Sequence, residues 1–448
     1  MTLRRTVWER LVEWKANPRR RALLVDGARQ VGKTYLIRRF AAEYYDIVLE
    51  INFLETPSAI DAFAGDLDAD TIITNLSIYS DRPFVPGRTL IFLDEIQECP
   101  RARTAIKFLV DDGRFDYIES GSMLGVSYKE VPSYPVGYEE KLTMYPLTLE
   151  EFLYANGIQK SIIDRTRACF TSKTPVPAPV HERLLTLFRR YMVVGGMPAV
   201  VSSFVETHDL RAVFNVQRGI LDLYRQDIAK YAATKMHIRS IFDAIPSQLD
   251  KKNKRFVLAD LSKNARMERY ASDFMWLADA GVVIPCRNVT EPVSPLKINE
   301  HRSLMKVFMA DVGLLSAFGM GDARRELLTG DAGINWGSFL ENLIAQELLA
   351  HGLEPYYYDR ARIGEVDFLV ERDGQVIPIE AKSGKDYTRH AALNNLLAVK
   401  EWGLDQAIVL CADNVSVDDD EPAITYMPWY MTMFIEKPQP GHIIIEEP

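Results

Sequence analysis

A phosphate-binding loop is predicted by eight consecutive residues near the start of the chain. They match the pattern G-x-x-x-x-G-K-[ST], in the order Gly27, Ala28, Arg29, Gln30, Val31, Gly32, Lys33 and Thr34. Glycines let the backbone curl so that successive N–H groups face a phosphate chain, and the helix that follows adds positive potential at its amino end. The lysine of this pattern reaches the β- and γ-phosphates, and the threonine offers a hydroxyl to Mg²⁺. The loop therefore predicts a site for ATP and Mg²⁺.

The segments on either side of the loop have the order that such a site needs. Arg21–Asp26 is apolar and predicts a buried strand, and Thr34–Tyr44 predicts a helix. A chance match to the pattern is the alternative, and this context disfavours it. Arg29 could contact a phosphate or a neighbour, and the sequence leaves both open.

A pair of acids predicts the second half of the same site. Thr89–Glu95 is apolar until it ends in Asp94 and Glu95. Open α/β sheets bind ligands at the carboxyl ends of their strands, where these acids would lie beside the loop. Asp94 would hold Mg²⁺ through water, and Glu95 would act as the general base that polarises the attacking water. Two solvated loop acids are the alternative; the pattern favours ATP hydrolysis over simple binding.

A polar residue after the next strand could sense the γ-phosphate. Phe115–Glu119 predicts a short strand, and Ser120 and Ser122 follow it. Either hydroxyl would lie at the same edge of the sheet as the two acids. An ordinary turn explains these serines equally well.

A hairpin near the carboxyl end carries a second set of chemical groups. Within Gly364–Lys382, the pair Asp373-Gly374 is a strong signal for a two-residue turn. If these two residues form the loop, Arg372 faces Gln375 and the pairing continues outward from there. Alternation along the strands then gives an apolar face, which consists of Val366, Phe368, Val370, Ile377, Ile379 and Ala381.

The same register places two carboxylates, Asp367 and Glu380, opposite each other on the other face. Facing carboxylates repel unless a cation lies between them, and oxygen ligands suit Mg²⁺ or Mn²⁺. Lys382 on this face could orient or deprotonate a water beside the metal, and Glu341 on the preceding helix could complete the ligands. Such a group predicts metal-dependent phosphodiester cleavage. The alternative is a solvent-facing hairpin in which Lys382 pairs with Glu365.

Strand and helix signals divide the chain into four regions. Strands alternate with helices through residues 1–160, which predicts a parallel sheet covered by helices and hence an α/β fold. A Pro-rich stretch, Lys173–Val180, lies in a mainly helical lid or linker region at 161–235. Val257–Lys263, Glu268–Ala280 and Val282–Pro285 predict helix, helix and strand within 236–330, an order typical of a winged helix. A helix and a strand-rich segment form the last region, 331–448.

A basic stretch in the third region could face DNA or RNA. Lys251–Arg269 holds seven basic residues against two acidic ones, Asp260 and Glu268. A chain with a net charge of −9 and a pI of about 5.5 can bind a polyanion only through such a local face. A solvated face, or a winged helix that serves as a lid or protein contact, is the alternative.

Length and composition fit a soluble globular protein with about two to four domains. The 448 residues include four cysteines, far apart and without a C-x-x-C pair, so neither a zinc site nor a disulfide framework is predicted. The amino terminus lacks the apolar run of a secretory signal, and no stretch reaches the roughly 18 apolar residues of a membrane span. We therefore expect a cytoplasmic protein without a membrane partner.

Beyond these residues, the chain resembles prokaryotic AAA-type ATPases that carry a carboxy-terminal domain of unknown function. The resemblance covers most of the chain. Its residues are the loop above and the segments Leu93–Gln97, Ser120–Ser122, Met144–Thr148, Gly195–Pro198, Arg225–Ile228 and Phe308–Leu315.

The resemblance implies a three-layer P-loop ATPase core, a winged-helix-like middle and a small α/β end domain similar to PD-(D/E)xK nucleases. In one departure, the Gly-Arg pair that the family has before its fifth strand is Gly137-Tyr138 here, so the role of that arginine is not carried over. Our first hypothesis is a Mg²⁺-dependent ATPase coupled to nucleic-acid binding, with a nuclease end. The alternative is an ATP-switched regulatory or interaction protein whose end domain is inert. A protein partner or a homo-oligomer would suit either.

Overall fold

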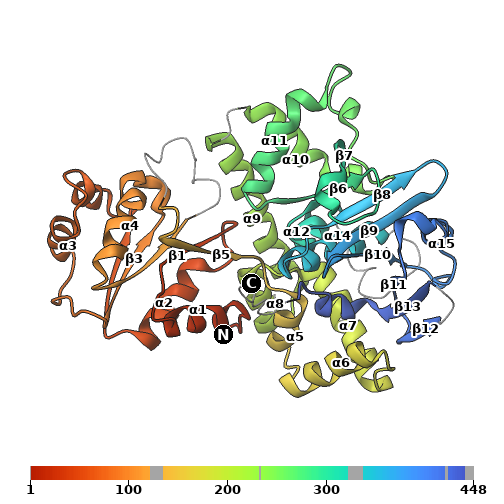
Figure 1. Ribbon diagram of the computed structural model, residues 1–448, viewed down its shortest axis with the longest axis horizontal. Helices are drawn as coiled ribbons and strands as arrows, with labels where there is room; N and C mark the ends of the chain where they lie inside the picture. The colour runs from red at the N-terminus through yellow and green to blue at the C-terminus, as the bar shows by residue number, and fades with distance from the viewer. Residues whose placement is uncertain (1, 122–134, 232–233, 321–335, 419–421, 439–448) are drawn as a thin grey trace, which may run out of the picture. The chain divides into compact units, whose positions relative to one another are not determined.

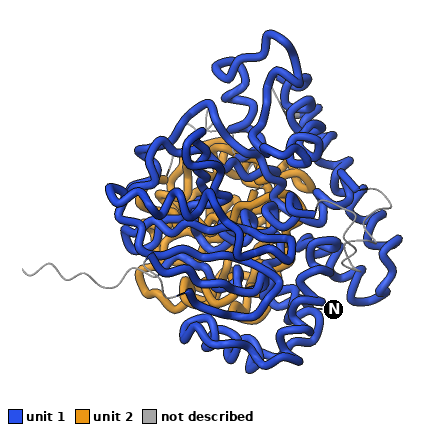
Figure 2. Tube along the Cα trace, turned by 90° about the vertical axis from the view of Figure 1, so that its right-hand side faces the viewer, with its two compact units in different colours: residues 1–4, 146–278, 282–448 blue, residues 5–145, 279–281 orange. Residues whose placement is uncertain are grey.

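The computed structural model describes residues 2–121, 135–231, 234–320, 336–418 and 422–438. The chain forms two compact units, coloured separately in Figure 2. The amino-terminal unit consists of Arg5–Tyr145 with Asp279–Gly281, and the carboxy-terminal unit consists of Met1–Arg4, Pro146–Ala278 and Val282–Pro448.

A five-stranded sheet forms the centre of the amino-terminal unit (Figure 1). Its strand order is β2-β3-β4-β1-β5, and every neighbouring pair is parallel. All five strands therefore present their carboxyl ends at the same edge. Their bounds are β1 Ala22–Gly27, β2 Ile47–Asn52, β3 Thr89–Asp94, β4 Asp116–Ser120 and β5 Glu139–Met144.

Helices cover both faces of this sheet, as the alternation of side chains along β3 shows. Leu90 and Phe92 point into a core with α1 and α2, whereas Ile91 and Leu93 point into a second core with α3, α4 and η1. The α/β fold of three layers predicted from the sequence is confirmed. The helices are α1 Val7–Ala16, α2 Lys33–Tyr44, α3 Ala69–Ser77 and α4 Pro100–Asp112, with the short turns η1 Pro57–Phe63 and η2 Ile96–Glu98.

An eight-stranded mixed sheet organises the carboxy-terminal unit (Figure 1). Its order is β12-β13-β11-β10-β9-β8-β6-β7, with β6 parallel to β8 and β9 antiparallel to β10. The bounds are β6 Val283–Val289, β7 Glu300–Met309, β8 Tyr356–Arg360, β9 Gly364–Arg372, β10 Gln375–Ala381, β11 Gln406–Cys411, β12 Ser416–Asp418 and β13 Ala423–Pro428.

In chain order, α5 to α11 come before the first strand of the sheet, and α12, α14 and α15 come between its strands. The helices of this unit are α5 Leu149–Ala155, α6 Lys160–Ser172, α7 Ala178–Val194, α8 Pro198–Thr207, α9 Leu210–Tyr231, α10 Lys235–Leu249, α11 Met267–Asp279, α12 Val312–Gly319, α14 Gly337–Ala350 and α15 Ala391–Leu397, with the short turns η3 Leu258–Asp260, η4 Leu296–Asn299, η6 Lys400–Trp402 and η7 Trp429–Phe434. Among the residues described, no helix combines the length and the apolar character that crossing a bilayer requires.

The sheet crosses the boundary that we expected between residues 330 and 331. Strands β6 and β7 come from the expected winged-helix-like region, yet Arg287 of β6 pairs with Tyr356 of β8. The helix expected at Val257–Lys263 does not form. Only the short turn η3 lies there, and none of its residues is buried. Without a buried apolar face, a helix at this position has little to stabilise it.

Three of the sequence landmarks meet inside the carboxy-terminal unit. The Gly196 N–H donates to Asp311 Oδ2 at 2.6 Å, and the Leu147 N–H donates to the Gly196 carbonyl at 2.6 Å. Asp311 also caps α12, because its Oδ1 accepts from the Leu314 N–H at 2.9 Å. Burial raises the pKa of Asp311 to about 6, although backbone hydrogen bonds act against that shift. Hydrogen bonds among these landmarks therefore connect the segment before α5 and the segment after α7 to the start of α12.

Candidate functional site

The phosphate-binding loop joins the carboxyl end of β1 to the amino end of α2. Gly27 has φ 148° and Gly32 has φ 94°, both in the region that favours glycine. A Cβ at Gly27 would lie 2.2 Å from the Met144 carbonyl oxygen, so the neighbouring strand end also excludes a side chain. The predicted strand, loop and helix are present, and glycines occupy two loop positions that other residues rarely adopt.

Lys33 is the first residue of α2 and lies against the loop. Its Nζ donates to the carbonyls of Gly27 at 3.0 Å and Ala28 at 2.9 Å. Burial lowers the pKa of Lys33 to about 8, while the charges of Glu95 and Asp94 act in the opposite direction. The ammonium is therefore held beside the main chain that would cradle a phosphate.

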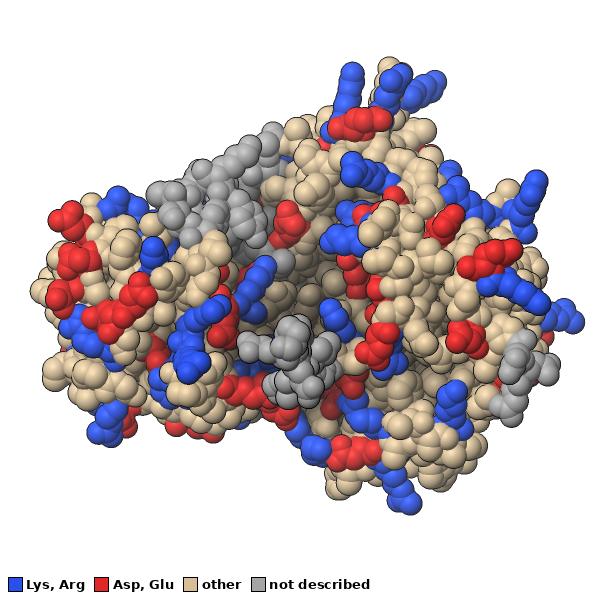
Figure 3. Space-filling view, viewed as in Figure 1, with Lys and Arg blue, Asp and Glu red and all other residues tan. Residues whose placement is uncertain are grey.

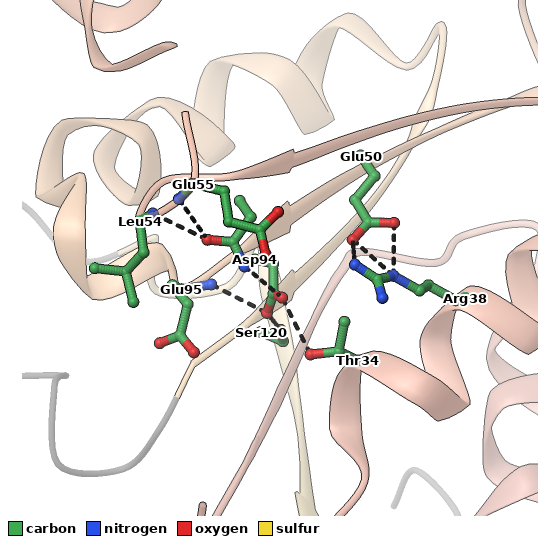
Figure 4. A network of polar contacts seen from close by, with 9 residues as sticks. Thr34, Arg38, Glu50, Leu54, Glu55, Asp94, Glu95 and Ser120 are labelled. Atoms are coloured by element: carbon green, nitrogen blue, oxygen red, sulfur yellow. Dashed lines mark hydrogen bonds and ion pairs between the residues drawn. The ribbon is translucent and has the colours of Figure 1, made fainter. Parts of the chain in front are cut away.

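Asp94, at the end of β3, is the centre of a hydrogen-bond network drawn in Figure 4. Its Oδ2 accepts from the Thr34 hydroxyl at 3.1 Å and from Asn52 Nδ2 at 3.1 Å. Its Oδ1 accepts from the Glu95 N–H at 3.1 Å and from the Ser120 hydroxyl. Groups from the loop, β2 and β4 thus converge on one carboxylate.

Mg²⁺ fits the groups around Asp94 by its ligand preference. It binds oxygen, from carboxylates and hydroxyls, and it retains several waters. The hydroxyl of Thr34 and the carboxylate of Asp94 lie within hydrogen-bond distance of each other at the start of α2. Both oxygens can therefore serve one ion, directly or through water.

Glu95 directs its carboxylate away from this network (Figure 4). The residue has φ 54°, an unusual value for a glutamate, and it accepts a hydrogen bond from Gln97 Nε2. The amide of Gln97 has room because position 121 is glycine; a Cβ there would lie 2.7 Å from Gln97 Oε1. Residues with an unusual backbone conformation, such as Glu95, are frequent at functional sites.

Sequence reasoning missed Asn52 and Gln97. Asn52 ends β2 beside β3, and Gln97 lies two residues after Glu95. A polar residue at the end of a neighbouring strand was the signal for Asn52, but the strand order was needed to use it. Ser122, the second candidate sensor, lies outside the described residues. The roles assigned to Arg29, Ser120 and Glu95 stay predictions.

The carboxy-terminal hairpin has the predicted register. Gln375 pairs with Arg372, and the ladder continues to Ile379 and Phe368. Asp373 and Gly374 have φ 51° and 75°, as a two-residue turn of this kind requires. The last predicted pair is replaced by another contact, because Asp367 Oδ2 accepts from the Ala381 N–H at 2.9 Å.

The predicted carboxylates do gather, but lysines lie among them. Lys306 Nζ on β7 is 2.6 Å from Glu365 Oε1, 3.3 Å from Glu341 Oε2 and 4.0 Å from Asp367 Oδ1. Burial, with the charges of Glu341 and Glu380, raises the pKa of Asp367 well above its usual range. We call the group of Lys254, Lys306, Glu341, Glu365, Asp367, Glu380 and Lys382 the carboxylate cluster.

This geometry differs from the arrangement expected for a metal ion at Glu341, Asp367 and Glu380, and the metal site itself stays a prediction. In the part of the chain that the structure describes, no three acidic, histidine or cysteine side chains are arranged to hold a metal ion. Ammonium groups, rather than a metal ion, lie beside these carboxylates in the structure. Lys382 matches neither the expected role beside a metal nor the alternative pair with Glu365, because its Nζ pairs with Glu380 Oε1 at 2.7 Å.

Side chains of the basic stretch Lys251–Arg269 divide into two groups. Lys254 points inward and pairs with Glu341 at 2.6 Å, and Lys251 pairs with Asp260. Of the remaining five cations, Arg255 is half-buried, and Lys252, Lys263, Arg266 and Arg269 are exposed. Figure 3 shows Lys and Arg side chains over the segment that joins α10 to α11, with an acidic side chain among them.

The amino-terminal unit has the fold and the loop of a P-loop NTPase. Residues 19–153 match the family model described as an AAA domain. Residues 185–324 and 336–430 match two models described as domains of unknown function, DUF8612 and DUF4143. No curated protein matches the chain.

Solved structures that are similar to the chain include three proteins from two organisms. The Aeropyrum pernix ORC1 protein in complex with DNA is 14% identical, over 74% of this chain and 93% of that one, with a TM-score of 0.29. The ORC2 protein of that organism in its ADP form is 12% identical, over 73% and 94%, with a TM-score of 0.31. Domain III of the Thermotoga maritima replication initiation protein DnaA is 14% identical, over 48% and 90%, with a TM-score of 0.29.

Proposed function

We propose that the protein binds ATP with Mg²⁺ at Gly27–Thr34 and hydrolyses it. The supporting observation is the network at Asp94, where the Thr34 hydroxyl of the loop and the Ser120 hydroxyl of β4 reach the same carboxylate. A loop of N–H groups, a lysine and a hydroxyl–carboxylate pair are the parts that phosphoryl transfer from ATP requires.

Each residue has a separate role in this proposal. The main chain of the loop and the Lys33 ammonium bind the β- and γ-phosphates, and Thr34 and Asp94 hold Mg²⁺. The ion supplies neutralisation of the charge that develops on the phosphates. Glu95 accepts a proton from the attacking water, and Gln97 fixes the direction of the Glu95 carboxylate.

Turnover and binding of ATP by three variants test this function. Lys33→Ala should lose both, because the phosphates lose their cation. Glu95→Gln should keep ATP binding but turn over about 10²–10⁴ times more slowly, since only the general base is removed. The matched control is Glu50→Gln on β2, an acid-to-amide change at a residue that pairs with Arg38 at 2.6 Å outside the Asp94 network. Wild-type turnover in Glu95→Gln would refute the assignment of Glu95.

Coupling to nucleic acid is our second proposal, supported by the four exposed cations of the basic stretch. The segment from Lys252 to Arg269 spans 18 residues and carries the four exposed side chains, Lys252, Lys263, Arg266 and Arg269. A gel shift with these side chains neutralised tests the proposal. Nuclease activity is not part of it, because lysines already neutralise the carboxylate cluster.

A further inference from the structure

Lys306 is the most deeply buried cation of the carboxylate cluster. Its side chain has 0% exposure, and its Nζ lies 5.1 Å from the centre of the Tyr357 ring and 6.0 Å from that of Phe368. The carboxylates of Glu365 and Glu341 approach the same Nζ at 2.6 and 3.3 Å. An ammonium group in such a place is stable only because carboxylates surround it.

Two more lysines complete the neutralisation. Lys254 Nζ lies 2.6 Å from Glu341 Oε1, so Glu341 has a lysine on each of its oxygens. Lys382 Nζ lies 2.7 Å from Glu380 Oε1. Four carboxylates thus face three ammonium groups, and the cluster comes within one charge of balance without any other ion.

A divalent ion would meet an obstacle at the point where the carboxylates converge. The ion needs carboxylate oxygens, and the Lys306 ammonium already lies within 4.0 Å of three of them. Two positive charges a few ångströms apart repel strongly where water is scarce. Because Lys306 has no exposed surface, its ammonium cannot move to water without opening the packing around β7.

We propose that Lys306 takes the place of a divalent metal ion in the carboxylate cluster, and that its removal creates a metal site. The cluster then has a structural role in this chain. It joins β7 and the segment before η3, through Lys306 and Lys254, to α14 and β9. Methionine is one atom shorter than lysine and uncharged, so Lys306→Met removes the ammonium group and lets Glu341, Glu365 and Asp367 reorient oxygens toward Mg²⁺ or Mn²⁺.

Binding of Mn²⁺, measured by the loss of its free-ion electron paramagnetic resonance signal, tests the proposal. All variants carry Asp94→Asn, so that the Asp94 network contributes no ion. The Asp94→Asn chain should bind no Mn²⁺, and Asp94→Asn with Lys306→Met should bind one. Adding Asp367→Asn should abolish the gained binding. Circular dichroism verifies that each variant is folded.

Two results would overturn the proposal. One is Mn²⁺ binding by the Asp94→Asn chain that disappears when Asp367→Asn is added, because Lys306 would then coexist with the ion. The other is a folded Lys306→Met variant that binds no Mn²⁺. If Lys306→Met does not fold, the first comparison still decides. None of these measurements depends on ATP turnover, so the proposal stands or fails separately from the ATPase.

Discussion

The charge of Lys33 depends on the pH near neutrality. Burial lowers the pKa of this lysine to about 8, although Glu95 and Asp94 favour the charged form. An unperturbed lysine would stay charged up to pH 10. Because only the ammonium form can attract phosphates, binding of ATP should respond to pH around this value.

The affinity for a non-hydrolysable ATP analogue should depend on the charge of Lys33. A lowered pKa means that the charge is lost as the pH rises through about 8. The Kd should therefore increase about tenfold between pH 7 and pH 9, if one proton on Lys33 is required. Titration calorimetry at several pH values measures this. Lys33→Arg is the control, since arginine stays charged and its Kd should be flat over the same range. A flat profile for the wild type would contradict the assigned role.

Residues that form a local pattern could be predicted, and residues that act across the fold could not. Gly27–Thr34 is a contiguous motif, and Asp94 and Glu95 end an apolar strand, so their meeting followed from a parallel sheet. The position of Asn52 beside them could be inferred only once the strand order was known. Lys254 was assigned to a nucleic-acid face, yet it pairs with Glu341. Such a contact between distant segments leaves no spacing in the sequence.

At the scale of elements, close backbone contacts fix how the helices of the carboxy-terminal unit meet. A Cβ at Gly196 would lie 2.0 Å from the Leu147 carbonyl oxygen, and one at Gly313 would lie 2.2 Å from the Val194 carbonyl oxygen. Gly196, just after α7, meets the segment before α5, and Gly313, in the first turn of α12, meets the end of α7. Their absence of a side chain is a packing requirement, since neighbouring backbone cannot move aside cheaply.

Substitution of Gly196 by alanine should therefore lower the free energy of unfolding by about 3 kcal/mol. The matched control is Gly219→Ala, within α9, where a Cβ would meet nothing within 4 Å. That change should instead stabilise the protein by about 0.5–1 kcal/mol, because alanine favours a helix interior. Urea unfolding followed by circular dichroism measures both. Equal effects of the two substitutions would show that the Leu147 contact does not constrain the unit.

Element order was easier to predict than element pairing. The turn at Asp373-Gly374 fixed the hairpin register because the two strands are adjacent in the chain. The parallel pairing of β6 with β8 has no such local signal, so the expected regions at 236–330 and 331–448 were separated although they share a sheet. Parallel strands need a long connection, and its course depends on packing rather than on turn residues.

At the scale of the whole molecule, charge limits the proposed contact with nucleic acid. The net charge of −9 makes the average surface repel a polyanion. Ion pairs occupy Lys251 and Lys254, so the exposed cations that remain in the basic stretch are Lys252, Lys263, Arg266 and Arg269. Any affinity must therefore come from few contacts, and it should be weak and strongly dependent on salt.

A gel shift with single-stranded and duplex DNA should follow this limit. Changing Lys252, Lys263, Arg266 and Arg269 to glutamine should abolish the shift at low salt. In the wild type, log Kobs should fall with log salt concentration with a slope of about −0.9 for each duplex phosphate contacted, hence no steeper than about −4. The matched control neutralises four exposed cations elsewhere in the same unit, Arg165, Lys173, Arg183 and Arg211, and should keep the shift. If both quadruple variants bind like the wild type, the basic stretch is a solvated face. A slope much steeper than −4 would mean that cations outside this stretch contact the DNA.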